Sequence, residues 1–322
     1  MDQTVRVIGV DIGGTTIKAA TATSQGELLS EVRSPTQRGS GQAILEGILE
    51  TIGQTIEEAG LMSADIAAGG IGAPGSVDRK RGLWGGSTTI HLGMQVSLTD
   101  MVRERFGIPA YIDNDGNVAA LGEMRFGAGG GVRDMIYIAL GSGVGGAIII
   151  DSQIHYGRGP IAGEIGHMIV QKDGPLCGCG AHGCLEAFAS ATAMIGEAQA
   201  ALQAGEPTLL RELVESDPTN LNGEIIARAA RRGDRVALRI WREAGRALGV
   251  AIYSLAMLLG PEVFIIGGAL AQAGELIFEP MYEKLEQESG GRFNPRQVRM
   301  AALGARAGLM GGVALALRMA DS

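Results

Sequence analysis

The pattern of apolar and polar positions predicts three strands at the start of the chain. Residues 5–11 form an apolar run with β-branched side chains, which is typical of a buried strand. A glycine turn and two more short segments follow at about residues 17–23 and 27–33, so three antiparallel strands are expected in a row. From about Gln42 to Ala59, isoleucines recur at every fourth position, which predicts a helix with one buried face.

Strands and helices continue to alternate in the next segment. A strand and turn are expected in IAAGGIGAPGSVD, followed by an irregular loop from Arg79 to Gln95. A helix at about Leu98–Phe106 leads to the short strand AYID and to the turn NDGN, after which VAALGEMRF continues as a helix.

The strand pattern then occurs a second time. Residues 135–140 form a buried strand, followed by the turn GSGVGG and two short strands up to residue 157. Two copies of one unit, about 130 residues apart, indicate a duplicated domain in which each half presents a glycine turn. The remainder is expected to be mostly helical, at about 185–204, 207–215, 222–231, 234–259 and 307–319, with a buried strand beginning at Val263.

Composition and charge indicate a globular protein and disfavour nucleic-acid and membrane partners. With 322 residues, 46% of them apolar, the chain is long enough for one or two domains with a large core. The net charge of −8 disfavours a nucleic-acid partner, and the most basic stretch, 228–239, has the spacing of a solvated helix face. No stretch approaches ~20 uninterrupted apolar residues, and the first residues lack a signal-peptide pattern, so we expect no membrane partner and a cytoplasmic location.

All three cysteines lie in the run CGCGAHGC. Cys177, Cys179 and Cys184, with His167 ten residues upstream of the first, make a complete tetrahedral ligand set for a structural Zn2+. Buried inert thiols are the alternative, but the segment is glycine-rich and polar and offers no apolar face. Three thiolates and one imidazole leave no open position for a reacting water, so we expect a structural metal.

Two carboxylates lie close to this cluster in sequence. Glu164 precedes His167 in GEIGHM, and Glu186 follows Cys184 in CLEAFAS. A rigid metal site with carboxylates at its rim is typical of a support for a polar ligand site.

Two glycine turns have the composition of phosphate-binding turns. DIGGTT brings Asp11, Gly13, Gly14, Thr15 and Thr16 to the end of a buried strand. Glycines let backbone N–H groups approach an anion, hydroxyls add donors, and Asp11 is suited to hold Mg2+ through water. Standing alone, this would be an ordinary hairpin turn.

The second turn, GSGVGG, contributes Gly141, Ser142, Gly143 and Gly145. It fits the dinucleotide fingerprint by letters only, because a strand and not a helix follows it, so we reject an NAD site. Two such turns facing one another would hold a triphosphate from both sides. In IIGGAL, Gly267 and Gly268 end a buried strand and either pass close to an adenosine or serve as a packing turn.

The turn NDGN carries the candidate for proton transfer. Four polar residues and a glycine after a strand exceed what a helix cap needs, although Asn117 or Asp115 would serve as one. In phosphoryl transfer to an alcohol, one carboxylate accepts the hydroxyl proton, and Asp115 is our candidate. Asn114 is placed to hydrogen-bond sugar hydroxyls. Strand alternation points Asp113 the other way.

Together these motifs resemble the ROK family (repressor, open reading frame, kinase), and within it the bacterial ATP-dependent glucokinases. DIGGTT resembles the first phosphate motif of the family, NDGN its catalytic turn, GSGVGG its second phosphate motif and IIGGAL its adenosine segment. The stretch GEIGHM…CGCGAHGCLEAFAS is the most specific match, and the resemblance extends from Asp11 to the last helix.

The resemblance implies a fold and a domain plan. The fold would be α/β, the actin-like ATPase (sugar kinase) fold, with two α/β domains, a duplicated core and an interdomain cleft. Residues 1–117 would form a small domain completed by the C-terminal helix 305–322, and residues 118–304 a large domain with the zinc motif.

The resemblance also implies an activity: ATP-dependent phosphorylation of a hexose at the 6-hydroxyl, most simply glucose to glucose 6-phosphate, with Mg2+ and in a homodimer or homotetramer. Asp115 would be the general base. The implied sugar-binding residues are Asn114, Glu164, His167, Glu186, Gly75 and Thr89, with His167 serving zinc and sugar through different ring nitrogens.

One loop departs from the pattern of the family. Glucokinases of the family usually carry Asn and Trp where this chain has Thr89 and Gly93, and Trp84 is nearby but shifted. A kinase for N-acetylmannosamine, fructose or allose is therefore a second hypothesis. A non-enzymatic sugar-sensing repressor is a third, disfavoured because the first strand begins near residue 5.

Overall fold

The computed structural model describes residues 5–37, 39–87, 89–158, 162–214 and 217–320. The chain divides into two compact units: unit 1 consists of Met1–Gly131 and Ala302–Ser322, and unit 2 of Val132–Ala301. The expected boundary after residue 117 falls inside the helix α3 (Asp115–Phe126), and the division comes after this helix. The last two residues of the expected segment 305–322 lie outside the described residues.

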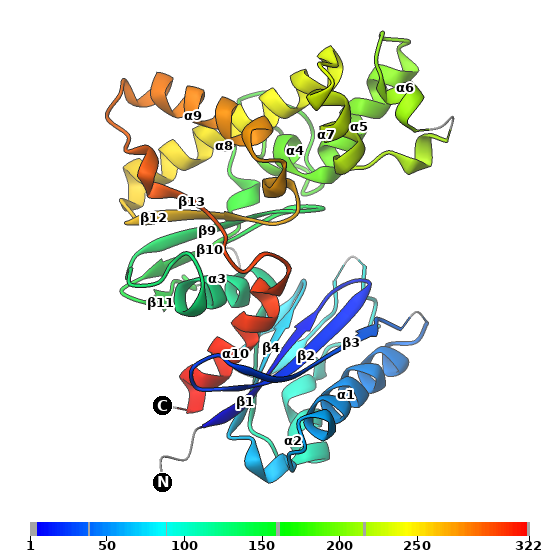
Figure 1. Cartoon of the computed structure of the whole chain (residues 1–322), viewed down its shortest axis with the longest axis vertical. Helices are drawn as coiled ribbons and strands as arrows, with labels where there is room; N and C mark the ends of the chain where they lie inside the picture. Colours follow the sequence, from blue (N-terminus) through cyan, green and yellow to red (C-terminus); the bar gives the residue numbers. More distant parts are fainter. Residues whose placement is uncertain (1–4, 38, 88, 159–161, 215–216, 321–322) are drawn as a thin grey trace. The chain divides into compact units, whose positions relative to one another are not determined.

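Each unit combines a sheet that begins with three consecutive strands and helices that follow them (Figure 1). Unit 1 contains β1 (Arg6–Ile12), β2 (Thr16–Thr23), β3 (Leu28–Pro35), α1 (Gly41–Glu58), β4 (Ala68–Ala73), β5 (Val77–Asp78), β6 (Leu83–Trp84), β7 (Val96–Ser97), α2 (Leu98–Phe106), β8 (Ala110–Asn114), α3 and α10 (Ala307–Ala320). Unit 2 contains β9 (Met135–Leu140), β10 (Val144–Ile150), β11 (Gln153–Ile154), α4 (Glu186–Ala189), α5 (Ala191–Gln203), α6 (Leu210–Leu213), α7 (Gly223–Arg231), α8 (Arg235–Leu259), β12 (Val263–Gly267), α9 (Glu275–Ser289) and β13 (Val298–Met300).

The two large sheets share one topology. Unit 1 has the strand order β3-β2-β1-β4-β8 and unit 2 the order β11-β10-β9-β12-β13. In both sheets the first three strands pair antiparallel and the last two are added in parallel. The strands β5, β6 and β7 make a separate small sheet. The predicted duplication is therefore confirmed at the level of sheet order.

The first sheet buries both faces by alternation of its side chains. Ile8, Val10 and Ile12 of β1 join the core formed with α1 and α2, whereas Val7 points to the cluster formed with α10. Helix α10 approaches very closely, because a Cβ at Gly70 would lie 2.1 Å from the carbonyl oxygen of Gly312. Strand glycines here make room for a helix backbone.

The second sheet packs under helices. Buried side chains of β9 and β12 share one core with those of α5, α7, α8 and α9. The single helix expected at 185–204 is wrong: the chain breaks at Ser190, whose hydroxyl caps α5 by accepting from the N–H of Ala193 at 3.1 Å. Helix α6 covers only part of the expected 207–215. The sequence did not predict α9, which contains Pro280.

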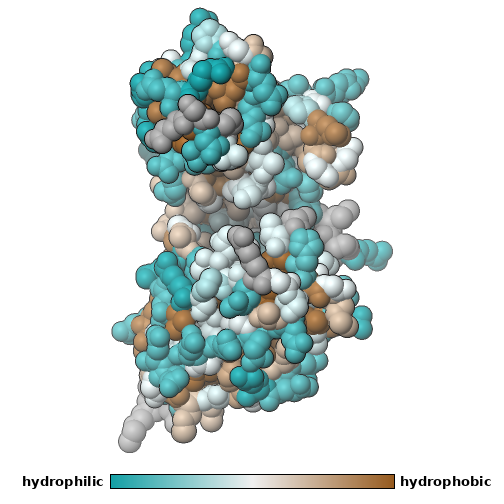
Figure 2. Space-filling model, turned by 90° about the vertical axis from the view of Figure 1, so that its right-hand side faces the viewer, coloured by the Kyte–Doolittle hydropathy of each residue, from teal (hydrophilic) through white to brown (hydrophobic). Residues whose placement is uncertain are grey.

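The surface is mixed in polarity. Figure 2 shows one face of the molecule, on which hydrophilic residues prevail and hydrophobic residues are scattered between them. Within the described part of the chain, no helix combines the length and apolarity needed to cross a membrane.

Candidate active site

The first glycine turn is a tight, pre-shaped hairpin between β1 and β2. The N–H of Gly13 donates to the carbonyl of Thr16 at 3.0 Å, and the hydroxyl of Thr36 donates to the carbonyl of Gly13 at 2.7 Å. Gly14 and Thr15 are exposed at its tip. The turn therefore presents backbone and hydroxyl donors without further rearrangement.

Asp11, the carboxylate expected to serve Mg2+, is paired with a cation of its own unit. The ammonium of Lys18 lies 2.9 Å from its Oδ2 and donates also to the carbonyl of Ala305 at 3.0 Å. Both side chains are largely buried. Sequence analysis did not single out Lys18, although β1 and β2 pair Asp11 directly with it.

The loop that departs from the family pattern lies against the first glycine turn. A Cβ at Gly14 would stand 2.9 Å from Oγ1 of Thr89. Ser87 shapes the loop, because its Oγ accepts the N–H of Thr89 at 3.2 Å and that of Ile90 at 3.1 Å. Thr88 lies outside the described residues. Two residues expected in different sites, Gly14 and Thr89, are therefore neighbours within unit 1.

Two other residues near this loop have distinct roles. Gly75 adopts a φ of 82°, and a Cβ there would stand 2.2 Å from the carbonyl oxygen of Gly86, so this position needs glycine. Trp84 is fully buried and donates from Nε1 to the carbonyl of Pro74 at 2.9 Å. Trp84 therefore serves the core and does not replace the missing Trp of the loop.

The NDGN turn places two carboxylates in different surroundings. Asp113 is buried at the end of β8 and accepts from Asn117 Nδ2 at 2.9 Å, whereas Asp115 is exposed at the first turn of α3. The helix cap is Asn114, whose Oδ1 accepts from the N–H of Gly116 at 2.9 Å, and not Asn117 or Asp115 as we considered.

The second glycine turn lines a cavity in unit 2. Gly141 and Ser142 stand at one side of a hollow of about 510 Å³. Its remaining wall comes from α5, α7, α8 and the segment after β12, namely Ala191, Asn222, Gly223, Glu224, Ala227, Arg231, Trp241, Ala269, Leu270, Gln272 and Ala273. The Nε1 of Trp241 is buried and has no hydrogen-bond partner among the described residues. The hollow suits a flat, polar-edged ligand next to a phosphate turn.

The packing interpretation of the segment IIGGAL is confirmed for its two glycines, and the adenosine interpretation stays a prediction. Gly267 and Gly268 are packing positions, since a Cβ would lie 2.6 Å from the Tyr137 hydroxyl and 2.2 Å from the Leu140 carbonyl oxygen respectively. The residues that follow them, from Ala269 onward, line the cavity.

Glu186 connects the phosphate turn to the cysteine cluster. Its Oε2 accepts the N–H of Val144 at 2.9 Å, and its Oε1 lies 3.8 Å from Sγ of Cys177. A Cβ at Gly143 would stand 2.5 Å from the same Oε2, so only glycine fits beside it. Sequence analysis assigned Glu186 to the sugar; the structure places it also against the glycine turn.

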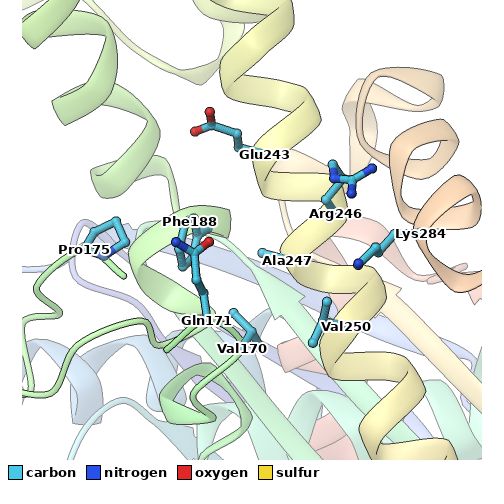
Figure 3. A pocket seen from close by; sticks show the side chains of 9 residues that line it. All are labelled: Val170, Gln171, Pro175, Phe188, Glu243, Arg246, Ala247, Val250 and Lys284. Carbon is cyan, nitrogen blue, oxygen red and sulfur yellow. The ribbon is translucent and has the colours of Figure 1, made fainter. Parts of the chain in front are cut away.

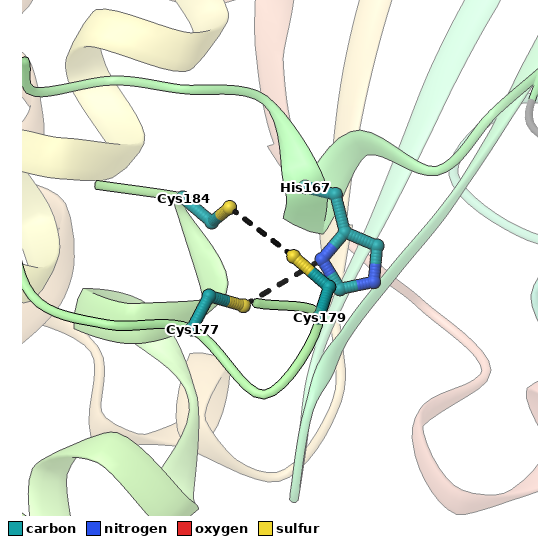
Figure 4. A group of neighbouring side chains, drawn as sticks. All are labelled: His167, Cys177, Cys179 and Cys184. Atoms are coloured by element: carbon teal, nitrogen blue, oxygen red, sulfur yellow. Dashed lines mark hydrogen bonds between the residues drawn. The ribbon is translucent and has the colours of Figure 1, made fainter. Parts of the chain in front are cut away.

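The four predicted metal ligands converge (Figure 4). The ligand atoms of His167, Cys177, Cys179 and Cys184 all lie within 4.8 Å of one another. Sγ of Cys177 is 3.7 Å from Nδ1 of His167, and Sγ of Cys179 is 3.7 Å from that of Cys184. Because Nδ1 faces the thiols, Nε2 is the ring nitrogen left for another ligand.

The spacing of these atoms fits a tetrahedral zinc ion. Zinc–sulfur bonds of about 2.3 Å place neighbouring sulfurs of a tetrahedron about 3.8 Å apart. The thiols also need a cation to be ionised together: burial raises the pKa of Cys177 and raises that of Cys184 to about 12. The donor set therefore fits Zn2+ by identity, distance and charge.

Glu164 and His167 stand next to one another at the edge of this cluster. His167 ends a short 3-10 turn, Ile165–His167, and its N–H donates to the carbonyl of Glu164 at 3.0 Å. Both side chains are exposed. The turn thus presents one carboxylate and one imidazole to the surface of unit 2.

A second hollow of unit 2 contains none of the predicted site residues. It measures about 400 Å³ and lies between α8, α9 and the segment 170–175 (Figure 3). Its charged side chains are Glu243, Arg246 and Lys284, and burial raises the pKa of Glu243. We assign no role to it.

These motifs can now be compared with known proteins. The sequence model of the ROK family matches residues 7–319. The chain belongs to the ROK family. It is 38% identical over 318 residues to a glucokinase of Streptomyces coelicolor, with 96% of each chain covered. A crystal structure of a ROK family glucokinase from Streptomyces griseus in complex with glucose and AMPPNP is 39% identical, with a TM-score of 0.79, covering 97% of this chain and 99% of that one.

Regulators also belong among the relatives of this ROK protein. A xylose repressor of Caldicellulosiruptor bescii is 30% identical over 318 residues, which cover 97% of this chain and 78% of the repressor. The expected family and sugar-kinase fold are confirmed.

Sequence analysis missed the helical wall of the cavity beside the second glycine turn. Asn222, Arg231 and Trp241 come from α7 and α8 and meet Ser142 only in the folded unit. Nothing in their local sequence marks them, because helix-surface polar residues are usually solvated.

Proposed function

We propose that this ROK protein is an ATP-dependent hexose kinase that transfers the γ-phosphoryl group of ATP to the 6-hydroxyl of glucose. One observation carries the proposal: a single glycine turn, Gly141–Gly143, lines the cavity of unit 2 and is held by Glu186, which also contacts the cysteine cluster. The second glycine turn, this cavity and the predicted sugar residue Glu186 are therefore joined within unit 2, which supports the proposal. Kinship with glucokinases over nearly the whole chain supports the same activity.

The proposed nucleotide mode follows from the cavity. The adenosine would occupy the hollow lined by α7, α8 and the segment after Gly268, with its phosphates extending along Ser142 and Gly143. Gly13, Gly14, Thr15 and Thr16 of unit 1 would hold the terminal phosphates through backbone and hydroxyl donors. Mg2+, which fits the oxygen donors at Asp11, would neutralise phosphate charge.

In the proposed reaction Asp115 accepts the proton of the sugar 6-hydroxyl. The oxygen of that hydroxyl forms a bond to the γ-phosphorus of ATP, and the bond between the γ-phosphorus and the oxygen of ADP breaks. Such transfer depends mainly on positioning and on a correctly placed carboxylate. Asn114 would orient the sugar, and Glu164, His167 and Glu186 would bind its other hydroxyls. The reaction draws on residues of both units.

Zn2+ would be held by Cys177, Cys179, Cys184 and Nδ1 of His167. Bound there, the ion would cross-link the segments and fix the tautomer of His167 with the proton on Nε2, which would then donate to a sugar oxygen. Three reduced cysteines as ligands favour a cytoplasmic location.

Thr89 is the proposed determinant of sugar choice. Its position next to Gly14 puts a short hydroxyl where an amide is usual in glucokinases of the family, leaving room for a substituent on the sugar. Glucose is the first candidate; N-acetylmannosamine, fructose and allose are the alternatives.

The test is a coupled assay of ADP formation by purified, zinc-loaded protein with Mg2+, across glucose, mannose, fructose, allose, N-acetylglucosamine and N-acetylmannosamine. We expect the highest kcat/KM with glucose. A preference for another sugar would transfer the specificity to that sugar and to the Thr89 loop. No turnover with any of them would reject the kinase and favour the sugar-sensing branch of the family.

We propose further that the chain forms a homodimer or homotetramer. The end of α8 supports this, because Met257 and Leu258 are 67% and 78% exposed. Sedimentation at micromolar concentration measures the mass directly.

A further inference from the structure

The chain passes between the two units twice, once after Gly131 and once after Ala301. A single buried carboxylate, Glu123 of α3, holds the unit 1 side of both passages. This side chain has no exposed surface, and among the described residues no cation pairs with it; three backbone N–H groups satisfy it. A buried polar group is tolerated only when it is hydrogen-bonded, so these three contacts are what keep it there.

The three donors come from both passages. The N–H of Ala128 donates to Oε2 of Glu123 at 2.9 Å, just before the first passage. The N–H of Ala302 donates to the same Oε2 at 3.0 Å and that of Leu303 to Oε1 at 2.8 Å, just after the second. The main-chain carbonyl of Glu123 also accepts from Gly129 at 2.9 Å. Segments about 175 residues apart in sequence thus end on one carboxylate.

The position of Gly127, next to this carboxylate, requires a residue without a side chain. A Cβ at this position would stand 2.1 Å from Oε2 of Glu123 and 2.8 Å from its Cδ. No other residue fits without pushing the carboxylate away from its donors.

Unit 2 holds the opposite ends of the same passages. The carboxylate of Glu262 accepts the N–H groups of Arg133 and Asp134 at 2.6 and 3.0 Å. The N–H of Ala301 donates to the carbonyl of Ile266 in β12 at 2.9 Å. The second passage is therefore one peptide link long, from Ala301 to Ala302, and the first is left with residues 131 and 132, because the N–H of Gly130 still donates to the carbonyl of Gly127 at 3.3 Å.

We propose that Glu123 is a positioning residue: it pins both passages to α3, the helix that carries Asp115. The inference rests on the proposed function for its kinetic consequence only. Phosphoryl transfer depends on correct positioning of the reacting groups, and Glu123 holds the two passages in one arrangement beside the helix of the proposed base.

Glu123→Gln tests the proposal with little change in shape. One of the two oxygens becomes an amide nitrogen, which cannot accept, so at least one N–H among Ala128, Ala302 and Leu303 loses its acceptor. Amide hydrogen exchange resolved to single residues should accelerate about tenfold or more at one or more of these three positions, as expected for the loss of a hydrogen bond to a charged group. Unchanged exchange at all three would overturn the proposal.

Kinetics separate positioning from mere stability. Loss of folded enzyme lowers kcat and leaves KM unchanged, whereas a smaller competent population raises the KM of hexose and ATP by the same factor. We expect a rise of about three- to tenfold in both KM values, because loosened passages lower the population of enzyme that is competent to bind its substrates. Faster exchange with unchanged KM would overturn the positioning role. If the wild type phosphorylates no hexose, the proposed function fails, and the exchange data still decide the pinning by Glu123.

Three further variants complete the test. Gly127→Ala displaces the carboxylate without removing it and should reproduce the exchange pattern if Glu123→Gln does not fold. Glu262→Gln should accelerate only the amides of Arg133 and Asp134. Glu206→Gln removes an exposed carboxylate paired with Arg239 and should change neither exchange at the passages nor KM.

Discussion

At the scale of single residues, the ligand turns depend on what stands opposite each glycine. Gly143 faces Glu186 and Gly14 faces Thr89, so neither glycine is there for backbone freedom alone. The two aspartates of the catalytic turn are separated by burial: Asp113 supports the turn, and Asp115 is left at the surface of α3.

Asp115→Asn is expected to lower kcat by about 10²- to 10⁴-fold, the contribution of a general base, with little change in hexose affinity because the amide keeps the shape of the carboxylate. Coupled assay and calorimetric titration of the sugar measure the two effects. Asp65→Asn, an exposed carboxylate of unit 1, is the control. Near-normal turnover in Asp115→Asn would remove this residue from the mechanism.

Gly143→Ala is expected to raise the KM of ATP about tenfold, because relieving the clash with Glu186 costs about 1–3 kcal/mol at the phosphate turn. Gly196→Ala on α5 is the matched control, since a Cβ there meets nothing within 4 Å. Initial rates over a series of ATP concentrations measure the change. Equal KM values in the two variants would contradict the contact between Gly143 and Glu186.

At the scale of elements, two groups of side chains hold together segments of unit 2 that are separate in sequence. The cysteine cluster ties the short turn Ile165–His167 to the segment before α4. Glu262 ties the chain at Arg133 and Asp134 to the start of β12. Helix patterns were predicted well where a long apolar stripe exists, as in α1 and α8, and failed at Ser190, where a side-chain cap divides the helix.

Loss of the proposed Zn2+ should loosen the turn Ile165–His167, which carries one of its ligands. Cys184→Ser is expected to lose the bound ion, to lower the Tm and to weaken hexose binding, because binding of a structural zinc contributes about 10–16 kcal/mol in small domains. Metal content by plasma emission, with thermal melts and sugar titration, measures this. His182→Ala is the control, since its Nδ1 faces the carbonyl of Gly174 and not the cluster. Full sugar affinity without metal would contradict the link.

Glu262 predicts an acid-dependent stability. Hydrogen bonds from the N–H groups of Arg133 and Asp134 lower the pKa of its carboxyl in the folded state. Its stabilisation is therefore present above the ordinary glutamate pKa of about 4.3 and is lost as the pH falls through the lower folded pKa. The Tm of Glu262→Gln should lie below that of the wild type at about pH 7, and the two should converge near pH 3. The variant Glu104→Gln, at an exposed carboxylate, is the control. A difference in Tm between Glu262→Gln and the wild type that persists near pH 3 would contradict the predicted pH dependence.

At the scale of the whole molecule, two units of equal strand order share one chain that passes between them twice. The proposed kinase needs residues from both, so its ligands should stabilise the chain as a whole. Glucose and a non-hydrolysable ATP analogue at about 100 times their Kd should each add about 2.7 kcal/mol to the free energy of unfolding. Thermal melts measure this, with L-glucose as the control. Asp115→Asn should keep both shifts, and the absence of any shift with glucose would reject glucose as substrate.

The sequence by itself determined the features that depend only on residues close to one another along the chain. Apolar periodicity located the strands of both copies and most helices, and three thiols and one imidazole predicted a zinc site whose four ligand atoms the structure brings together. Glycine turns at strand ends were visible because a turn is a local conformation. Similar motifs in a known family then indicated the fold, which the comparisons confirmed.

The tertiary structure decided every contact that depends on register and packing between distant segments. Lys18 beside Asp11, Thr89 against Gly14 and Glu186 between a glycine turn and Cys177 are such contacts. So are the three N–H groups on Glu123, whose donors come from segments about 175 residues apart in sequence. A periodic pattern records whether a side chain is buried, but not which partner meets it, because that partner is chosen by the pairing of strands and the docking of helices.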